Sequence, residues 1–166
     1  LWFADTLQGR KADVLILTGT PGAASSEDRI TGINNKLPLY PNINVLASQT
    51  GYYDRARSLP VAENMLQRFP QAEAILCLND EMAMGALAAA KAMGRNVNIT
   101  GMDANPDALQ AVGEGELYMT IALPPYDIGR FGVQFAQKVL NGESIPPRYI
   151  MDGSFVTQDN GAEFIK

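Results

Sequence analysis

Residues 12–18, Ala-Asp-Val-Leu-Ile-Leu-Thr, are followed directly by Gly19, and this stretch decides how the chain folds. The run is short, apolar and rich in branched side chains, and it lacks the polar–apolar alternation of a strand with one wet face. A strand that is buried on both faces has this pattern, and such strands belong to sheets that helices cover on both sides. We therefore expect helices between this strand and the next ones.

The rest of the chain alternates between short β-branched runs and longer segments whose apolar residues have helical spacing. Further strands are predicted at 44–49, 73–78, 97–102 and 118–123, with a last extended segment at 149–156. Helices are predicted at 25–37, 56–69, 80–93, 106–112 and 128–140. Parallel strands joined by helices need right-handed crossovers, so the pattern predicts an α/β fold with a doubly wound, mostly parallel sheet.

Composition narrows the classes of function. The chain has 166 residues, of which 46% are hydrophobic and 19% charged, and its net charge is −5. It can build a packed core, it has no apolar run near the ~18 residues of a membrane span, and its acidity argues against nucleic acid as a partner. The absence of histidine excludes Ser-His-Asp and Cys-His catalysis and His-based metal sites, so we expect no metal and no cofactor. The single cysteine, Cys77, lies in an apolar run and is expected to be a buried core thiol.

Ligands of open parallel sheets bind at the carboxyl ends of the strands, so the residues that follow each strand are the candidate contacts. Arg29, Tyr53, Asn79 and Asp103 follow the first, second, third and fourth predicted strands. Carboxylate and amide groups exchange hydrogen bonds with hydroxyls, the arginine fork bridges two neighbouring oxygens, and a tyrosine ring covers the C–H face of a sugar. The set suits a sugar or polyol, and it contains no nucleophile with an adjacent base.

These residues also have purely structural interpretations. Asn79 is a good helix N-cap, and Arg29 alternatively pairs with Asp28 or Asp54. Asp103 is alternatively a solvated loop carboxylate.

Two adjacent tyrosines, Tyr52 and Tyr53, follow the second predicted strand. Neighbouring side chains point in different directions, so we expect one ring to face inward and one outward. In the structural interpretation the inward ring is simply part of the core.

The glycine-rich stretch after the first strand invites comparison with a phosphate-binding loop. It lacks the Lys-Ser/Thr pair of that loop, and only Gly19 and Gly22 are present where a dinucleotide motif needs three spaced glycines. We interpret it as a turn and helix N-terminus that is capped by Ser25 or Ser26.

Five segments resemble the ribose-type periplasmic sugar-binding proteins of ABC transporters, over about residues 12–156. They are Leu-Thr-Gly-Thr-Pro-Gly-Ala-Ala-Ser-Ser-Glu-Asp-Arg-Ile-Thr-Gly (17–32), Tyr-Asp-Arg (53–55), Leu-Asn-Asp-Glu-Met-Ala-Met-Gly-Ala (78–86), Gly-Met-Asp-Ala (101–104) and Thr-Ile-Ala (120–122). The ligand-sensing domains of lactose-repressor-type regulators share that fold and are the alternative function. A Rossmann-like enzyme is disfavoured, because the chain lacks histidine and a phosphate loop.

The resemblance implies a non-catalytic, periplasmic protein whose two Rossmann-like lobes close over one sugar or polyol and then engage an ABC permease of the inner membrane. It implies that residues 1–123 form the C-terminal ligand-binding lobe. Residues 124–148 then contain the hinge crossings, which the Pro-Pro pairs at 124–125 and 146–147 mark, and a helix of the other lobe. Residues 149–166 form a return strand and tail.

The start of the chain also points to a fragment. Residues 1–9 indicate the end of a helix already under way. A lobe without its partner exposes apolar surface, so we expect the fragment to self-associate.

Carried over by position, Arg29, Asn79 and Asp103 resemble the sugar-hydroxyl ligands of these proteins, and Tyr53 resembles the stacking aromatic. Leu123 stands where ribose binders place a glutamine after the Thr-Ile-Ala strand. That difference removes a polar contact and favours a less hydroxylated or differently shaped ligand than ribose.

Overall fold

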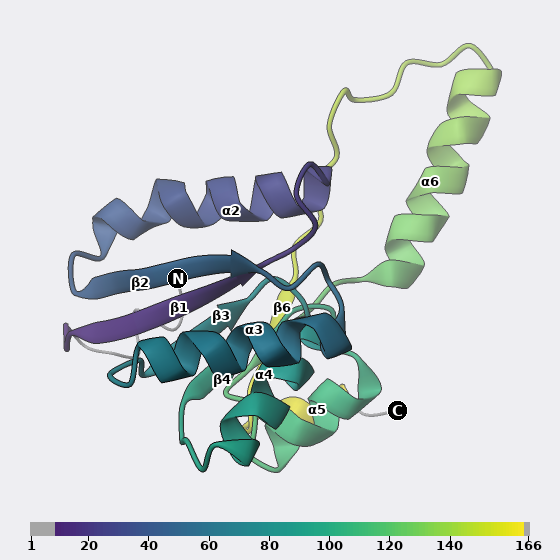
Figure 1. The fold of residues 1–166 in the computed structure, drawn as a ribbon. Helices are drawn as coiled ribbons and strands as arrows, with labels where there is room; N and C mark the ends of the chain where they lie inside the picture. The colour runs from purple at the N-terminus through teal and green to yellow at the C-terminus, as the bar shows by residue number, and fades with distance from the viewer. Residues whose placement is uncertain (1–8, 165–166) are drawn as a thin grey trace.

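A parallel sheet with the strand order β2–β1–β3–β4 lies at the centre of the fold (Figure 1). The computed structural model describes residues 9–164, so the helix predicted over residues 1–9 lies outside the described part apart from Gly9. The strands are β1 (Ala12–Thr18), β2 (Ile43–Thr50), β3 (Ala74–Cys77) and β4 (Asn98–Thr100). Val14, Leu15, Ile16 and Leu17 are all buried, which confirms that β1 is covered on both faces.

The sheet continues beyond β4. Backbone amides of Gly101 and Asp103 donate to the carbonyls of Met119 and Ile121, both at 2.9 Å, so the chain that leads through β5 (Thr120–Ala122) runs parallel to the β4 segment. The mostly parallel α/β sheet is therefore confirmed. On its far side β5 pairs antiparallel with β6 (Ser154–Val156), so only the last three residues of the predicted segment 149–156 form a strand.

Helices cover the two faces of the sheet. The helix α2 (Ala24–Lys36) lies on one face, and α3 (Arg55–Arg68), α4 (Asp80–Ala92) and α5 (Pro106–Gly113) lie on the other (Figure 1). Two short 3₁₀ segments, η1 (Leu37–Leu39) and η2 (Gly161–Glu163), complete this part of the chain. The larger core cluster lies on the α3 and α4 side and contains Cys77, whose predicted burial is confirmed. None of the described helices is long and apolar enough to cross a lipid bilayer.

The start of α2 differs from the prediction that Ser25 or Ser26 caps it. The helix begins one residue earlier than predicted, at Ala24. Its N-cap residue is Ala23, which has no side-chain acceptor, so neither serine caps the helix. The turn is closed by the Ala23 carbonyl, which accepts from the amide of Ser26 at 2.9 Å. The Glu27 carboxylate then accepts from the amide of Gly22 at 3.2 Å, so the loop does not need a serine cap.

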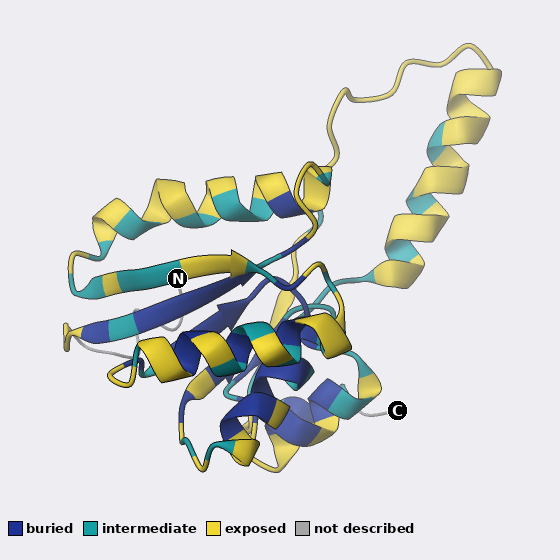
Figure 2. Ribbon diagram, viewed as in Figure 1, coloured by how far each residue is buried: buried dark blue, intermediate teal, exposed yellow. Residues whose placement is uncertain are grey.

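The last helix, α6 (Pro125–Leu140), projects away from the sheet (Figures 1 and 2). None of its residues is buried, and Leu140 is 87% exposed. Its aromatic side chains Phe131 and Phe135 meet Tyr149 of the returning chain, with ring centroids 4.8 and 5.4 Å away. A helix with apolar residues on an uncovered face needs a further surface to pack on.

Close packing of α3 against α4 positions the loops that precede them. At Gly85 a Cβ atom would lie 2.1 Å from the Ser58 hydroxyl oxygen and 2.5 Å from the Arg55 carbonyl oxygen. Only glycine permits this approach, because the second of these atoms belongs to the backbone and cannot rotate away.

We predict that Gly85→Ala lowers the free energy of unfolding by about 1–3 kcal/mol, since the added methyl group forces α3 and α4 apart. Gly32→Ala is the matched control: Gly32 is also inside a helix, but nothing lies within 4 Å of a Cβ placed there. The control should raise stability by about 0.5–1 kcal/mol through helix propensity. Urea unfolding followed by circular dichroism measures both, and equal effects of the two substitutions would contradict the packing argument.

Candidate functional site

Arg29 reaches from α2 over the carboxyl edge of the sheet and joins three of the strand-end loops. Its Nη2 lies 3.5 Å from Oδ1 of Asp103, and its guanidinium carbon lies 5.7 Å from the centroid of the Tyr53 ring. Its Nη1 donates a hydrogen bond to the Leu78 carbonyl, directly before Asn79. Tyr53, Asp103 and the loop that contains Asn79 therefore lie around one guanidinium group.

The alternative partners of Arg29 are not supported. The Asp54 carboxylate caps α3 instead, where it accepts from the amide of Arg57 at 2.8 Å. No ion pair joins Arg29 to Asp28 in the part of the chain that the structure describes. The sequence did not distinguish these acids from Asp103, because the distance between the loops depends on the sheet.

Asn79 caps a helix, as its sequence context suggested, and part of its side-chain amide remains available for a further hydrogen bond. It is only 8% exposed, and its Oδ1 accepts from the amide of Met82 at 3.0 Å, which confirms the N-cap of α4. This bond uses the carbonyl end of the amide alone. The Nδ2 group has no hydrogen-bond partner among residues 9–164, so it is left to donate to another group.

The two adjacent tyrosines face different ways, as predicted. Tyr52 is partly exposed, and the guanidinium group of Arg57 stacks on its ring. The distance between the Arg57 guanidinium carbon and the centroid of the Tyr52 ring is 3.6 Å. Tyr53 packs against the core, and its ring occupies the space where a side chain at Gly19 would be. The Tyr53 hydroxyl is buried without a hydrogen-bond partner in the described part of the chain.

Backbone strain is concentrated in the two loops that carry Tyr53 and Asp103. The described non-glycine residues with positive φ are Tyr52 at 60°, Tyr53 at 58°, Asp103 at 117° and Ala104 at 57°. Each such conformation costs about 1–3 kcal/mol and persists only when its surroundings enforce it. Strained residues of this kind cluster at functional sites, so their location at the predicted ligand edge is an independent indication of a site.

Asp103 is neither fully solvated nor fully buried. Its side chain is 35% exposed and pairs with Arg29, so the interpretation as a merely solvated carboxylate is wrong. Burial raises the pKa of the Asp103 carboxyl above its ordinary value, and the Arg29 guanidinium offsets part of this rise. An ionised carboxylate held beside an arginine is well suited to accept hydrogen bonds from ligand hydroxyls.

Leu123 follows β5 and lies against the returning chain. A Cβ placed on Gly153 would be 3.4 Å from Cδ2 of Leu123. Arg29 contacts Asp103, Tyr53 and the backbone directly before Asn79, whereas no contact of Leu123 with this group is seen in the described part of the chain. The contribution of all five residues to ligand binding stays a prediction.

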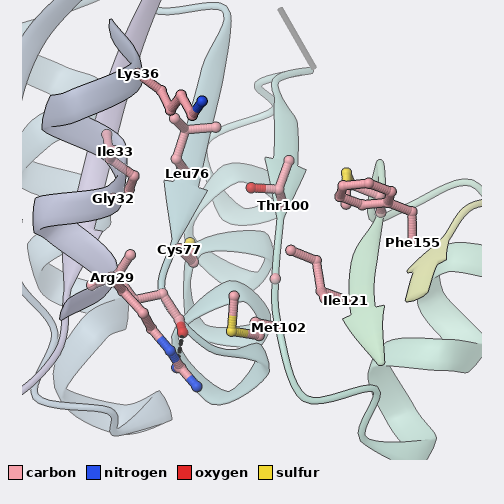
Figure 3. Close-up of a pocket in the computed structure, with 13 residues that line it drawn as sticks. Arg29, Gly32, Ile33, Lys36, Leu76, Cys77, Thr100, Met102, Ile121 and Phe155 are labelled. Carbon is pink, nitrogen blue, oxygen red and sulfur yellow. Dashed lines mark hydrogen bonds between the residues drawn. The ribbon is translucent and has the colours of Figure 1, made fainter. Parts of the chain in front are cut away.

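A cavity of about 340 Å³ lies beside this cluster, between α2 and strands β3 to β6 (Figure 3). Its walls are mainly apolar, and Arg29 is the one predicted site residue that lines it. The hydrogen bond from Arg29 to the Leu78 carbonyl marks its border with the polar cluster (Figure 3). Many ligand hydroxyls would find no partners there, so the cavity is a poor site for a polyol. The residues that line it with Arg29 include Ile33, Leu76, Met102, Met119 and Ile121.

Sequence reasoning missed the role of Asp80, an acidic residue that directly follows the N-cap residue Asn79. The Asp80 side chain is fully buried, and its Oδ1 accepts from the Thr120 hydroxyl at 2.7 Å. Its Oδ2 accepts from the amide of Asn105 at 2.8 Å. Burial raises the pKa of the Asp80 carboxyl, although the bonds from Thr120 and Asn105 act in the opposite direction. An acidic residue in a first helical turn is ordinarily solvated, so the sequence carried no signal for this contact.

Arg55 links the beginnings of three helices. Its Nε and Nη2 donate to the two oxygens of Glu81 at 3.1 and 3.0 Å, and Nη2 also pairs with Asp107. The hydrogen bond with Asp107 is the main cause that raises the pKa of Arg55. The fork therefore holds α3, α4 and α5 at a fixed spacing next to the loops of the site.

The raised pKa of Asp80 predicts a specific pH dependence of stability. Between the ordinary carboxyl pKa and the raised one, the folded protein binds more protons at this site than the unfolded chain does. The contribution of Asp80 to the free energy of unfolding therefore falls as pH rises through this window.

In Asp80→Asn this contribution is absent, so the stability of the wild type minus that of the variant should decrease as pH rises above the ordinary aspartate pKa of about 4. Urea unfolding at a series of pH values gives this difference, in which the other titrating groups cancel. A difference that is constant or rises with pH would show that the Asp80 pKa is not raised.

Comparisons with known proteins find relatives among periplasmic binding proteins. A family model described as a periplasmic binding protein domain matches residues 2–144. The chain is 38% identical over 151 residues to a ribose import binding protein of Escherichia coli, covering 90% of this chain and 51% of that protein. It is 35% identical over 162 residues to the D-allose-binding periplasmic protein of the same organism, covering 93% of the chain and 52% of the relative. The chain thus spans about half the length of the curated relatives it matches.

Solved structures agree with this assignment. The periplasmic binding protein component of an arabinose ABC transporter from Shewanella, bound to L-arabinofuranose, superposes with a TM-score of 0.89 at 33% identity. The match covers 98% of this chain and 56% of that one. A Caulobacter myo-inositol binding protein bound to myo-inositol gives a TM-score of 0.88 at 32% identity, again over 98% of this chain and 56% of the other.

Proposed function

Because the chain belongs to the periplasmic binding protein domain family, we propose that it forms one lobe of a periplasmic receptor that binds a sugar or polyol for an ABC importer. The observation that carries the proposal is the convergence of Asp103, Tyr53 and the Leu78–Asn79 loop on Arg29. The receptor has no catalytic role in this proposal, and its relatives are likewise binding proteins. None of the relatives described above favours the lactose-repressor-type alternative.

The chemistry of the cluster fits a polyhydroxylated ligand. Arg29 has guanidinium donors beyond the one that binds the Leu78 carbonyl, Asp103 accepts hydrogen bonds, and the free Nδ2 of Asn79 donates. Hydrogen bonds to charged groups contribute about 1.5–3 kcal/mol each when they are shielded from water. The Tyr53 ring offers an apolar surface for the C–H groups of the ligand.

A second lobe completes the receptor in this proposal. Residues 1–123 form the C-terminal ligand-binding lobe, 124–148 contain the hinge crossings and the helix α6 of the other lobe, and 149–166 return to the first lobe. Support comes from the uncovered position of α6 and from the chain's spanning about half the length of its relatives. Closure of the two lobes around the ligand would create the surface that a membrane permease recognises.

Leu123 narrows the ligand class. The resemblance places it where ribose binders have a glutamine, so a ligand edge that meets it finds an apolar side chain instead of a hydrogen-bonding group. We propose that the ligand carries fewer hydroxyls at this edge than ribose does, or presents a differently shaped edge.

The proposal is tested by following the backbone amide resonances of the chain while D-ribose, D-allose, xylitol and myo-inositol are added in turn. At least one probe should shift the Asn79 and Asp103 resonances with a Kd of about 1 mM or weaker, since one lobe leaves half of the ligand in water. D-ribose should not be the tightest of the four. Arg29→Lys removes the fork and should weaken binding about tenfold, the equivalent of about 1.4 kcal/mol.

Arg130→Lys is the matched control, because Arg130 lies on α6 and, among residues 9–164, pairs only with Asp127 and Gln134 of its own helix. It should bind the probes like the wild type. Absence of shifts at Asn79 and Asp103 with every probe, or equal binding by Arg29→Lys, would contradict the proposal.

We also propose that the chain self-associates when no second lobe is present, because α6 exposes Val133 and Leu140 on a helix without buried residues. Sedimentation velocity should show a concentration-dependent rise in mass. The double substitution Val133→Glu and Leu140→Glu should restore a monomer, and a wild-type chain that is monomeric at all concentrations would contradict the expectation.

A further inference from the structure

The strained loop at Asp103 and Ala104 is held by a buried pair of side chains. Thr120 of β5 accepts a hydrogen bond from the Ala104 amide at 3.4 Å and donates to Asp80 Oδ1 at 2.7 Å. The other carboxylate oxygen of Asp80 accepts from the Asn105 amide at 2.8 Å. The two backbone N–H groups that follow Asp103 are therefore both bonded to the Asp80–Thr120 pair.

Asp80 is not needed to cap its own helix, α4. Asn79 already fills that role for α4, and the Asp80 carboxylate is directed to a loop between β4 and α5. Both Asp80 and Thr120 are fully buried, and Gly101 is required beside them, because a Cβ there would lie 2.1 Å from Asp80 Oδ1. Burying a carboxylate is costly, and initiation of α4 does not explain the two hydrogen bonds that this carboxylate accepts from Thr120 and Asn105.

The geometry connects the pair to the ligand edge. With φ of 117° and 57°, Asp103 and Ala104 would relax to ordinary backbone angles if the following amides lost their acceptors. Relaxation would turn the Asp103 side chain away from Arg29, which lies 3.5 Å from it. The hydrogen bonds that the Asp80 carboxyl group and the Thr120 hydroxyl accept from these amides oppose this relaxation.

We propose that Asp80 and Thr120 are positioning residues that set the affinity of the ligand site by holding Asp103 in its strained conformation. The inference rests on the proposed function, and it adds two residues that do not touch the ligand themselves. They act on the ligand only through the loop and the Asp103 carboxylate.

Thr120 gives the sharper test, because Thr120→Val preserves the shape of the side chain and removes only the hydroxyl. Thr120→Ser keeps the hydroxyl and serves as the rescue variant, and Thr31→Val on the exposed surface of α2 serves as the control for the substitution itself. Each is studied at a temperature at which circular dichroism shows it to be folded. The first measurement needs no ligand: the one-bond Cα–Hα couplings of Asp103 and Ala104 differ between positive and negative φ.

In Thr120→Val these couplings should move toward values of negative φ, whereas Thr120→Ser and Thr31→Val should keep the wild-type values. In titrations with the probe that the wild type binds most tightly, Thr120→Val should raise the Kd about fivefold or more, the equivalent of about 1 kcal/mol, and Thr120→Ser should stay within about twofold. Unchanged couplings in Thr120→Val would overturn the inference, as would an unchanged Kd despite a lower melting temperature.

A double-mutant cycle separates action through Asp103 from a general loss of structure. Asp103→Gly removes the carboxylate and tolerates positive φ. In that background Thr120→Val should change the Kd less than about twofold, because the group that it positions is gone. A full additional loss would overturn the inference. If the wild type binds no probe, the proposed function fails, while the couplings still decide whether Thr120 holds the loop.

Discussion

Burial of β1 and β3 on both faces is the constraint on which the rest of this structure depends. Because helices on the two faces of the sheet connect its successive strands, β1 and β3 run parallel, and their carboxyl ends lie at one edge of the sheet. Three loops that leave that edge contain Tyr53, Asn79 and Asp103, and each continues into a helix. Residues as distant in sequence as Arg29 and Asp103 thereby come within 3.5 Å of each other.

Polar groups at this edge stabilise the fold with some of their atoms, and the proposed function assigns other atoms of the same groups to the ligand. Asn79 uses one end of its amide to cap α4 and leaves the other end free. Arg29 binds a backbone carbonyl with one nitrogen and faces Asp103 with another. The hydrogen bonds that fix these side chains leave part of their capacity unused, which is the arrangement expected of a preformed binding site rather than of a satisfied structural network.

The apolar surfaces of the molecule are packed to different degrees. The core on the α3 and α4 side is closed by tight contacts such as that of Gly85 with Ser58, whereas α6 has no buried residue. The cavity between α2 and the β5–β6 pair is lined mainly by apolar side chains although it adjoins the polar cluster. These uncovered apolar surfaces support the proposal that the chain is one lobe of a larger protein, in which a second lobe covers them. The polar groups at the sheet edge, in contrast, are already held in place by contacts within the described chain.

Much of this could be predicted from local sequence. The apolar run 12–18, the helical spacing of the intervening segments and the position of Asn79 before an acidic first turn determined the α/β class, the sheet edge and one helix cap, because each depends on neighbours within one turn or strand. The placement of Arg29, Tyr53, Asn79 and Asp103 after successive strands could be predicted for the same reason. The roles of these residues and of Leu123 in binding stay predictions.

Only the tertiary structure decided which of these groups meet. It chose Asp103 over Asp28 and Asp54 as the partner of Arg29, it buried Asp80 against Thr120, and it replaced the expected serine cap of α2 by a backbone turn. It also placed β6 beside β5. Such contacts depend on the register of strands and on loop conformations with positive φ, and their energy arises between segments that are tens of residues apart. The local pattern of side chains along the sequence therefore does not show which of these distant segments come into contact.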